Sequence, residues 1–525
     1  MTFDRFENRR RIVKAGVVAG SLFLPAPYAW VWAQSDGALK LLRLPKIALV
    51  IGNTKYVEAP LKNPGNDAKG IAGELQKLGF QVNLKLDAGR NDMIEAIRAF
   101  GAGLAKKKGV GMFYYAGHGV QLAWKNYLIP VDAVIDKVED MQAKTVELNS
   151  LLEGLVKAQN PMNVIILDAC RDNPFGSKVR SQQKGLSQFD APPGSLLAYA
   201  TSPGNTAADG EGANGLYTEN LLREIKVPEA RIEDVFKRVR LNVRRKSEGQ
   251  QIPWESTSLE EDFWFIPPKE IKRLSEEEQE RLFKEELALW GRIKAAKDPA
   301  PLEDYLRRYP SGKFTELAQL QLERVLSAQG EKKIQIESSA GNPFTKGSAT
   351  ADTAYRIGDS YTYRILDLKT RAEKRQGTAT VASITESEVV FGNGLVTDLL
   401  GNTIKAADGR RFTPRQQFPL EYAVGRQWHS RFVASTRKGD DEGVADLDLK
   451  IVGRERITVP AGTFDAFLID AVGKTVFKNQ TTESRWKRWM APDRVRRAIA
   501  FEETLTAGTK TLIAERGELI SFKQS

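Results

Sequence analysis

The 525-residue sequence contains one cysteine and two histidines, and this shortage narrows the chemistry that the chain can carry. A single cysteine cannot form a disulfide within the chain, and so few thiols and imidazoles exclude a zinc site built from several cysteines. With 41% hydrophobic and 28% charged residues, the chain is neither wholly disordered nor a multi-span membrane protein. Cys170 is therefore the one soft nucleophile available.

The charge of the chain is not concentrated in any one region. Lysine and arginine total 78 against 67 aspartate and glutamate residues, which gives a net charge of +11 spread over the whole length. A nucleic-acid-binding domain usually shows a local basic patch, so we expect no nucleic-acid partner. At about 150 residues per domain, the length predicts three or four folding units.

The amino terminus has the pattern of a bacterial export signal. A basic segment over 8–14, which includes Arg9-Arg10, precedes an apolar run that ends at Val31-Trp32-Ala33. We expect residues 1–33 to be a twin-arginine-like signal peptide, so that the mature chain lies in the periplasm without a membrane span. An uncleaved membrane anchor or a chance group of basic residues are the alternatives. A protein with one cysteine suits that oxidising compartment, because it cannot form a wrong internal disulfide.

Four regions follow this signal. Residues 45–268 alternate short apolar runs with amphipathic helices, which predicts an α/β domain whose largely parallel sheet is covered on both faces. Residues 272–327 are helical and charged, with a capping box at Ser275, and are weakly similar to a tetratricopeptide-type helical hairpin. Residues 328–353 have the composition of a linker. Residues 354–525 alternate with period two between turns, which predicts an all-β barrel or sandwich.

The residues that carry chemistry lie at the ends of two expected strands of the α/β domain. A strand over 110–115 precedes Gly117-His118-Gly119, and a strand over 163–167 precedes Asp168-Ala169-Cys170. Because the carboxyl ends of parallel strands meet at one edge of a sheet, we expect the imidazole and the thiol to face the same crevice. A cysteine hydrolase needs a thiolate and a nearby imidazole that protonates the leaving amine. The alternative for a lone cysteine is an inert, buried thiol.

Several stretches of the α/β domain resemble the caspase-like peptidases of bacteria, relatives of metacaspases and caspases. The stretch 114–121 reads Tyr-Tyr-Ala-Gly-His-Gly-Val-Gln, and 167–175 reads Leu-Asp-Ala-Cys-Arg-Asp-Asn-Pro-Phe. The resemblance follows the family order over nearly half of the chain. The matching stretches are 47–53, 61–67, 114–121, 126–132, 167–175, 197–204, 235–240 and 252–254.

This resemblance implies a caspase-like sheet sandwiched by helices and a cysteine endopeptidase that acts on proteins or peptides. It implies that His118 and Cys170 are the catalytic dyad and that the amides of Gly119 and Cys170 form the oxyanion hole. It implies no cofactor. We also expect no metal site, because the acidic residues from Asp132 to Asp140 lack a regular ligand spacing.

The resemblance also bears on specificity. Acidic residues of metacaspases that match Asp67 and Asp168 line the first specificity pocket and select arginine or lysine. A carboxylate can form a bidentate pair with a guanidinium, which an aspartate substrate cannot satisfy. Ala116 stands where metacaspases often have serine, so one polar contact of that pocket is missing. In the alternative interpretation, Asp67 is an ordinary acid at a helix amino terminus and Asp168 is a structural hydrogen-bond acceptor.

A second function remains open at this point. The caspase-like region could have little or no turnover, and the chain could act as a scaffold that binds cell-envelope partners through its carboxyl-terminal β region. The helical hairpin is another candidate surface for a protein partner. His429, beside Trp428 in a β segment, is expected to be structural.

Overall fold

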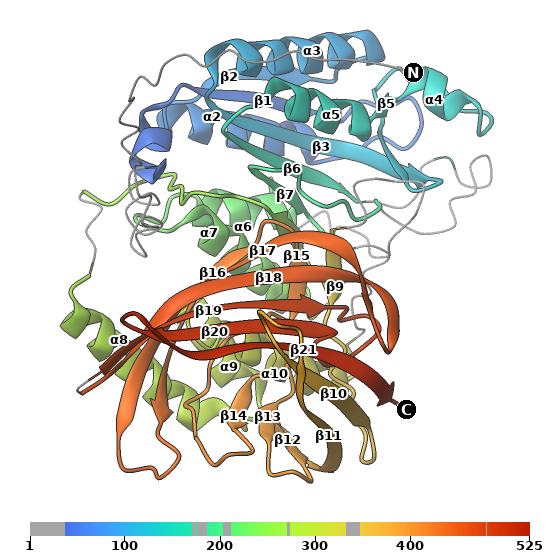
Figure 1. The fold of residues 1–525 in the computed structure, drawn as a ribbon. Helices are drawn as coiled ribbons and strands as arrows, with labels where there is room; N and C mark the ends of the chain where they lie inside the picture. The colour runs from blue at the N-terminus through green and yellow to red at the C-terminus, as the bar shows by residue number, and fades with distance from the viewer. Residues whose placement is uncertain are drawn as a thin grey trace, which may run out of the picture.

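The computed structural model describes residues 37–170, 175, 186–202, 212–269, 274–331, 347–478 and 480–525. The expected signal over 1–33 lies outside the described residues, as does the side chain of Cys170. An α/β domain, three helices and a carboxyl-terminal β module follow one another along the chain (Figure 1). None of the described helices has the length and apolar character needed to cross a membrane.

The α/β domain is built on a mixed sheet with the strand order β2-β1-β3-β6-β7-β8. The strands from β2 to β7 in this order are parallel, whereas β8 runs antiparallel to β7 and β4 forms a hairpin with β3. The expected α/β fold with a largely parallel sheet is confirmed, and the antiparallel β4 and β8 make the sheet mixed. The strands are β1 (Lys46–Gly52), β2 (Gln81–Leu86), β3 (Val110–Leu122), β4 (Lys125–Leu128), β5 (Val146–Glu147), β6 (Met162–Cys170), β7 (Ser195–Tyr199) and β8 (Trp254–Thr257).

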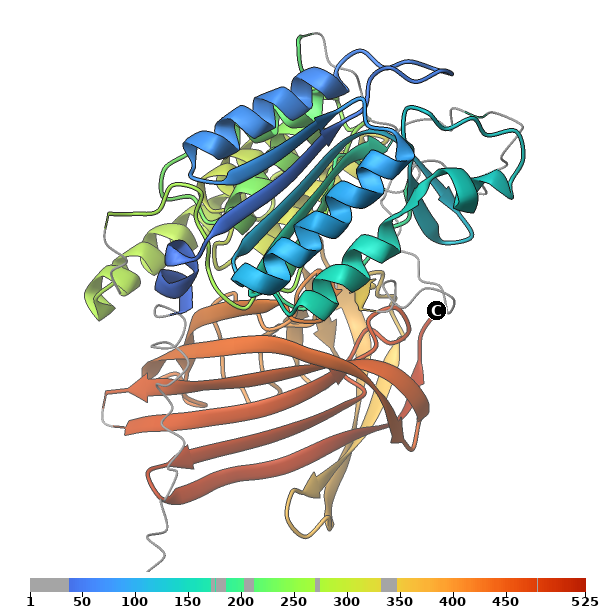
Figure 2. The ribbon, with the colours of Figure 1, turned by 90° about the horizontal axis from the view of Figure 1, so that it is seen from above.

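Helices cover both faces of this sheet, because its central strands are apolar on both sides. Successive residues of β1 show the pattern: Val50 enters one core with α2, α6 and α7, and Leu49 enters the other with α3 and α5. Figure 2 shows helices lying along the sheet on its two sides. The helices of this domain are α2 (Pro64–Lys77), α3 (Arg90–Lys107), α4 (Asp140–Lys144), α5 (Leu148–Ala158), α6 (Leu216–Glu224) and α7 (Ile232–Lys246).

Three helices connect the α/β domain to the β module: α8 (Glu276–Ile293), α9 (Pro299–Arg308) and α10 (Thr315–Ala328). The capping box expected at Ser275 is present, since its hydroxyl accepts the Glu278 N–H at 3.2 Å and its own N–H reaches the Glu278 carboxylate at 2.9 Å. Aromatic rings from all three segments, Trp290, Tyr305 and Phe314, meet in one core.

The C-terminal β module, residues 347–525, is one long antiparallel sheet with a separate two-stranded ladder. The sheet has the order β14-β13-β12-β11-β10-β21-β20-β19-β18-β17-β16, and β9 pairs with β15. The strands are β9 (Ser348–Thr350), β10 (Ser360–Asp367), β11 (Glu373–Ile384), β12 (Glu388–Phe391), β13 (Val396–Asp398), β14 (Thr403–Lys405), β15 (Glu421–Ala423), β16 (Gln427–Ser435), β17 (Glu442–Val459), β18 (Gly462–Phe477), β19 (Gln480–Met490), β20 (Ala500–Ala507) and β21 (Lys510–Lys523).

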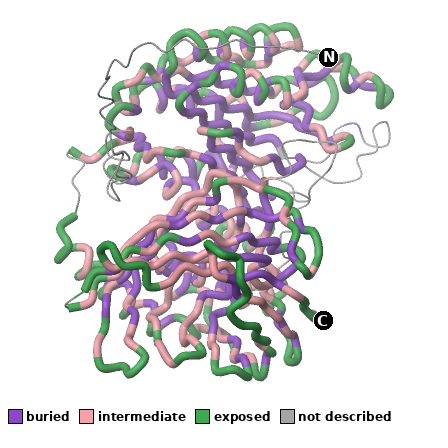
Figure 3. Tube along the Cα trace, viewed as in Figure 1, coloured by how far each residue is buried: buried purple, intermediate pink, exposed green. Residues whose placement is uncertain are grey.

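The long sheet curves back on itself, as expected of a barrel. Arg411 bridges to Lys405 of β14 and Phe412 bridges to Ala434 of β16, so the segment 411–413 links the two ends of the strand order. Helix α10 covers part of this sheet, since Leu317 and Leu320 pack into the same core as Tyr361 and Phe391. The curved sheet is visible from above in Figure 2, and Figure 3 shows that burial is densest in the sheet of the α/β domain.

Charged residues join the α/β domain to the β module. The guanidinium of Arg240 on α7 lies 3.0 Å from the Glu421 carboxylate of β15 and 3.7 Å from the Glu255 carboxylate of β8. Arg426 of the β module forms a close ion pair with Glu316 of α10. Because removing one partner leaves a buried charge uncompensated, such a network ties the three regions into one arrangement.

Glu323 on α10 makes this junction sensitive to pH. Burial first, and then the carboxylates of Glu421 and Glu316, raise the pKa of Glu323 to about 7, against 4.5 for an ordinary glutamate. The folded protein therefore retains a proton that the unfolded chain releases, so stability falls as pH rises from about 4.5 to about 7 and is level above that range.

We expect Glu323→Gln to remove part of this pH dependence, worth about 1–3 kcal/mol, and to raise the unfolding temperature at pH 8 relative to the parent. The measurement is thermal unfolding between pH 5 and pH 8. Glu277→Gln, at an exposed position of α8, is the matched control and should leave the curve unchanged. Parallel curves for the parent and Glu323→Gln would contradict the expectation.

Candidate active site

The β3 strand carries His118 inside a bulge rather than in a loop. Ala116 pairs with Asp168 of β6 and Gly119 pairs with Cys170, so three steps along β3 match two steps along β6. An extra residue of this kind bends the strand and redirects a side chain. The expected strand ends at 115 and 167 are therefore wrong, because β3 continues to Leu122 and β6 to Cys170.

Gly117 is required at this bulge for steric reasons. Its φ angle is +157°, and a Cβ atom there would lie 2.4 Å from the Tyr56 hydroxyl oxygen and 2.7 Å from that of Tyr115. Real Cβ atoms do not approach other atoms so closely. The glycine thus lets two tyrosine hydroxyls approach the backbone directly beside His118.

The imidazole of His118 is buried and held in one orientation. Its Nε2 atom lies 2.7 Å from the carbonyl oxygen of Ala59, and the Tyr56 ring packs with its centroid 4.5 Å from the centroid of the imidazole. A carbonyl oxygen can only accept a hydrogen bond, so Nε2 must carry the proton. In the neutral ring, Nδ1 is then the atom that can accept a proton, which is the role of a general base.

Two tyrosines hold the backbone of His118 in place. The His118 N–H donates to the Tyr56 hydroxyl at 2.8 Å, and the Tyr115 hydroxyl donates to the His118 carbonyl oxygen at 2.8 Å. Burial, followed by its neighbour Tyr56, raises the pKa of Tyr115 well above its ordinary value, so that it remains a neutral donor. The roles of Tyr56 and Ala59 were not predicted from the sequence. Ala59 gives no side-chain signal, because its contribution is a backbone carbonyl.

The backbone of Cys170 lies at the carboxyl end of β6, opposite Gly119 on the neighbouring strand. His118 and Cys170 therefore occupy adjacent strands at adjacent register positions, at the same edge of the sheet. The thiol itself is outside the described part of the chain. Gly119 is tightly enclosed, since a Cβ atom there would lie 2.7 Å from the Ala169 carbonyl oxygen and 3.0 Å from the Leu186 side chain. The catalytic and oxyanion-hole roles of these residues stay predictions.

Asp67 and Asp168 come from different elements and are both buried. Asp67 lies in the first turn of α2, and its carboxylate accepts the N–H of Gly215 at 2.9 Å. Asp168 lies on β6, and its carboxylate accepts the Thr218 hydroxyl at 2.8 Å. The amino-terminal end of α6 thus orients both carboxylates.

The hydroxyl of Tyr114 lies beside Asp168 and Thr218. It is 2.6 Å from the Thr218 hydroxyl and 3.4 Å from the Asp168 carboxylate. Burial, and then the negative charges of Asp168 and Asp67, raise the pKa of Tyr114 well above its ordinary value. Both predicted acids therefore act electrostatically on the same hydroxyl. Thr218, which orients Asp168, was not identified from the sequence, where it stands in an otherwise ordinary helix.

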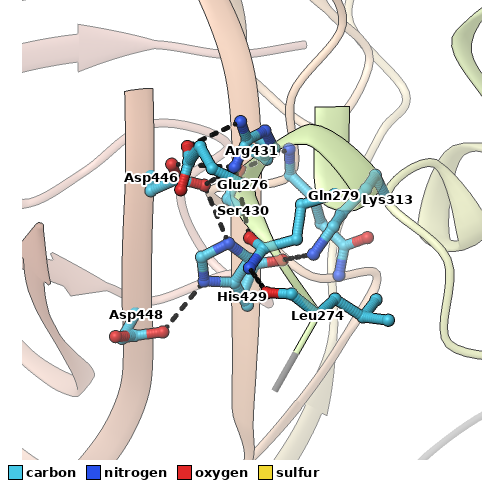
Figure 4. A network of polar contacts seen from close by, with 10 residues as sticks. Leu274, Glu276, Gln279, Lys313, His429, Ser430, Arg431, Asp446 and Asp448 are labelled. Atoms are coloured by element: carbon cyan, nitrogen blue, oxygen red, sulfur yellow. Dashed lines mark hydrogen bonds and ion pairs between the residues drawn. The ribbon is translucent and has the colours of Figure 1, made fainter. Parts of the chain in front are cut away.

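The other histidine lies in a different polar network, on β16 of the β module (Figure 4). Its ring nitrogens lie 2.9 Å from Asp448 and 3.1 Å from Asp446, and Arg431 links Asp446 to Glu276 of α8. The network joins the long sheet to the helices, which agrees with a structural role for His429. Among the described residues, no group of His, Cys, Asp and Glu side chains is arranged to hold a metal ion.

Comparison with known proteins identifies a matching family and two related sequences. Residues 45–264 match the family model of the caspase domain. Mucosa-associated lymphoid tissue lymphoma translocation protein 1 of Homo sapiens, and its homolog of Mus musculus, are each 30% identical over 192 residues. The match covers 35% of this chain and 22% of each relative, so it spans about a fifth of the length of these relatives.

Proposed function

Because residues 45–264 are a caspase domain, we propose that this chain is an exported cysteine endopeptidase that hydrolyses peptide bonds after arginine or lysine. One observation carries the proposal. The buried imidazole of His118 is oriented by the Ala59 carbonyl, on the strand whose next residue, Gly119, pairs with Cys170. The fixed ring and the only cysteine of the chain thus share one edge of the sheet.

The mechanism follows from these positions. Nδ1 of His118 takes the thiol proton of Cys170, and the thiolate attacks the carbonyl carbon of the scissile bond. The amides of Gly119 and Cys170 stabilise the resulting oxyanion, where one such donor is worth about 2.7–4 kcal/mol. The carbon–nitrogen bond then breaks as the imidazolium protonates the leaving amine. Water, activated by His118, hydrolyses the thioester and returns the thiol.

The acids Asp67 and Asp168 account for the proposed specificity. Both are buried, and a basic substrate side chain that reached them would exchange its hydrating water for contact with two carboxylates. A bidentate guanidinium–carboxylate pair is strong in such surroundings, whereas an acidic side chain would meet like charge.

Export is the second part of the proposal. The basic segment with Arg9-Arg10 and the apolar run after it support a twin-arginine-like signal over 1–33, which places the mature enzyme in the periplasm. The helices α8 to α10 and the β module then provide surface for a protein partner of the enzyme.

A peptide panel tests the proposed activity. The mature chain is incubated with peptides that carry arginine, lysine, glutamine or aspartate directly before a fluorogenic amine. We expect kcat/KM for arginine and lysine to exceed that for aspartate by about a thousandfold, because the aspartate complex would bury like charges together. A preference for aspartate would overturn the pocket assignment and leave the dyad standing. Absence of turnover on all four peptides would favour the alternative, a scaffold that binds envelope partners through the β module.

A further inference from the structure

The segment 186–192, which leads into β7, connects the candidate active site to the β module. We name it the bridging segment. At the start of the segment, the Leu186 side chain packs against Gly119. A Cβ atom added to Gly119 would lie 3.0 Å from this side chain. Asn126 of β4 fixes the next residue twice: its amide nitrogen donates to the Ser187 carbonyl and its amide oxygen accepts the Ser187 N–H, both at 2.7 Å.

The middle of the bridging segment is held by the α/β domain. The Phe189 N–H donates to the Tyr199 hydroxyl at 3.2 Å, and the Ala191 N–H donates to the Ser256 hydroxyl of β8 at 3.0 Å. Leu186 and Phe189 are fully buried in the core between the sheet and α3 and α5. The segment is thus an ordered part of the domain.

Asp190 turns the other way and contacts the β module. One of its carboxylate oxygens accepts the N–H of Gly347 at 2.5 Å, and the other accepts the hydroxyl of Ser348. Ser348 begins β9, which pairs with β15 through Ala423. Two residues after β15, Gly425 meets the α/β domain again, since a Cβ atom there would lie 2.8 Å from the Ser258 side chain.

We propose that Asp190 is a positioning residue through which the C-terminal β module holds the bridging segment against Gly119 and so sets the rate of peptide hydrolysis. The proposal rests on the proposed function. The chain of contacts is short: Asp190 is four residues from Leu186, and Leu186 packs on the glycine assigned to the oxyanion hole. Both carboxylate oxygens take part in the contact.

The test uses Asp190→Asn in the full mature chain. An asparagine can still accept the Gly347 N–H and can donate to the Ser348 hydroxyl, but both bonds become neutral and lose their charge assistance. We expect backbone amides of the bridging segment to exchange hydrogen about tenfold faster, which corresponds to one charge-assisted hydrogen bond. We expect kcat on an arginine peptide to fall severalfold with little change in KM.

Two further variants complete the experiment. Ser348→Ala removes only the hydroxyl from the other side of the contact and should produce a smaller change of the same kind. Asp304→Asn is the control, since its side chain is 71% exposed on α9 and it should change neither measurement.

The two readouts separate this proposal from the proposed function. Hydrogen exchange can be measured whether or not the chain hydrolyses peptides. If the parent protein hydrolysed no peptide, the peptidase assignment would be refuted, but faster exchange in Asp190→Asn would still support the contact of Asp190 with the β module. Unchanged hydrogen exchange of the bridging segment in Asp190→Asn would show that the contact does not hold the segment in place. Faster exchange with unchanged kcat in an active enzyme would overturn the positioning role.

Discussion

Cys170→Ala is expected to reduce turnover of arginine and lysine peptides by about 10⁴-fold or more, because no other side chain of the sequence supplies a soft nucleophile. Substrate binding should persist, since Asp67 and Asp168 are untouched. The measurement is single-turnover hydrolysis of an arginine peptide, together with the binding constant of that peptide for the inactive variant.

His118→Ala should cause a loss of similar size, and the double variant should be no worse than either single one, because the two residues act as a unit. The chain offers a matched control in His429→Ala, which removes the only other histidine from a network within the β module and α8. Its turnover at 25 °C should equal that of the parent. Retained hydrolysis in Cys170→Ala, or an equal loss of turnover in His118→Ala and His429→Ala, would contradict the assignment of the catalytic dyad.

Asp168→Asn is expected to lower kcat/KM on arginine peptides by about 10²–10³-fold, since it removes one charge from a buried ion pair with the substrate. The decisive comparison uses citrulline, which has the shape of arginine without its charge. The preference for arginine over citrulline should nearly vanish in the variant, while hydrolysis of the citrulline peptide itself changes little. Asp67→Asn should act in the same direction.

Thr218→Val is the control for this experiment. It deletes the hydroxyl that donates to Asp168 at 2.8 Å but leaves the carboxylate in place, so selectivity for arginine should be largely retained. If Asp168→Asn kept the full preference for arginine over citrulline, the acid would be a structural acceptor, which was the alternative interpretation of the sequence.

The fold class could be predicted because it depends on local patterns that burial enforces. Apolar residues such as Leu49 and Val50 must face opposite cores, and only a sheet covered on both faces satisfies them. The contribution of α10 to the β module could not be predicted in this way. Period two identifies a half-buried strand but does not reveal that α10 packs into the core of the sheet through Leu320.

The candidate site was predictable to the same degree. His118, Cys170 and the two acids stand out as residue types in recognisable surroundings. Their supports do not, because they act through geometry: the bulge after Ala116 is visible only in the pairing of β3 with β6. Tyr56 and Thr218 lie far along the chain from the groups that they contact, and no local pattern links them.

The carbonyl of Ala59 has a consequence for how the proposed active site can be inactivated by mutation. In many catalytic sites the group that orients the imidazole is a carboxylate or an amide, and a single codon change deletes it. Here the orienting atom belongs to the peptide bond that follows an alanine in left-handed conformation, at φ +54°. Every amino acid carries that oxygen, so point substitutions at this site cannot remove the acceptor. Only a change in the path of the loop, through an insertion, a deletion or relaxation of the strained φ angle, can withdraw it from His118.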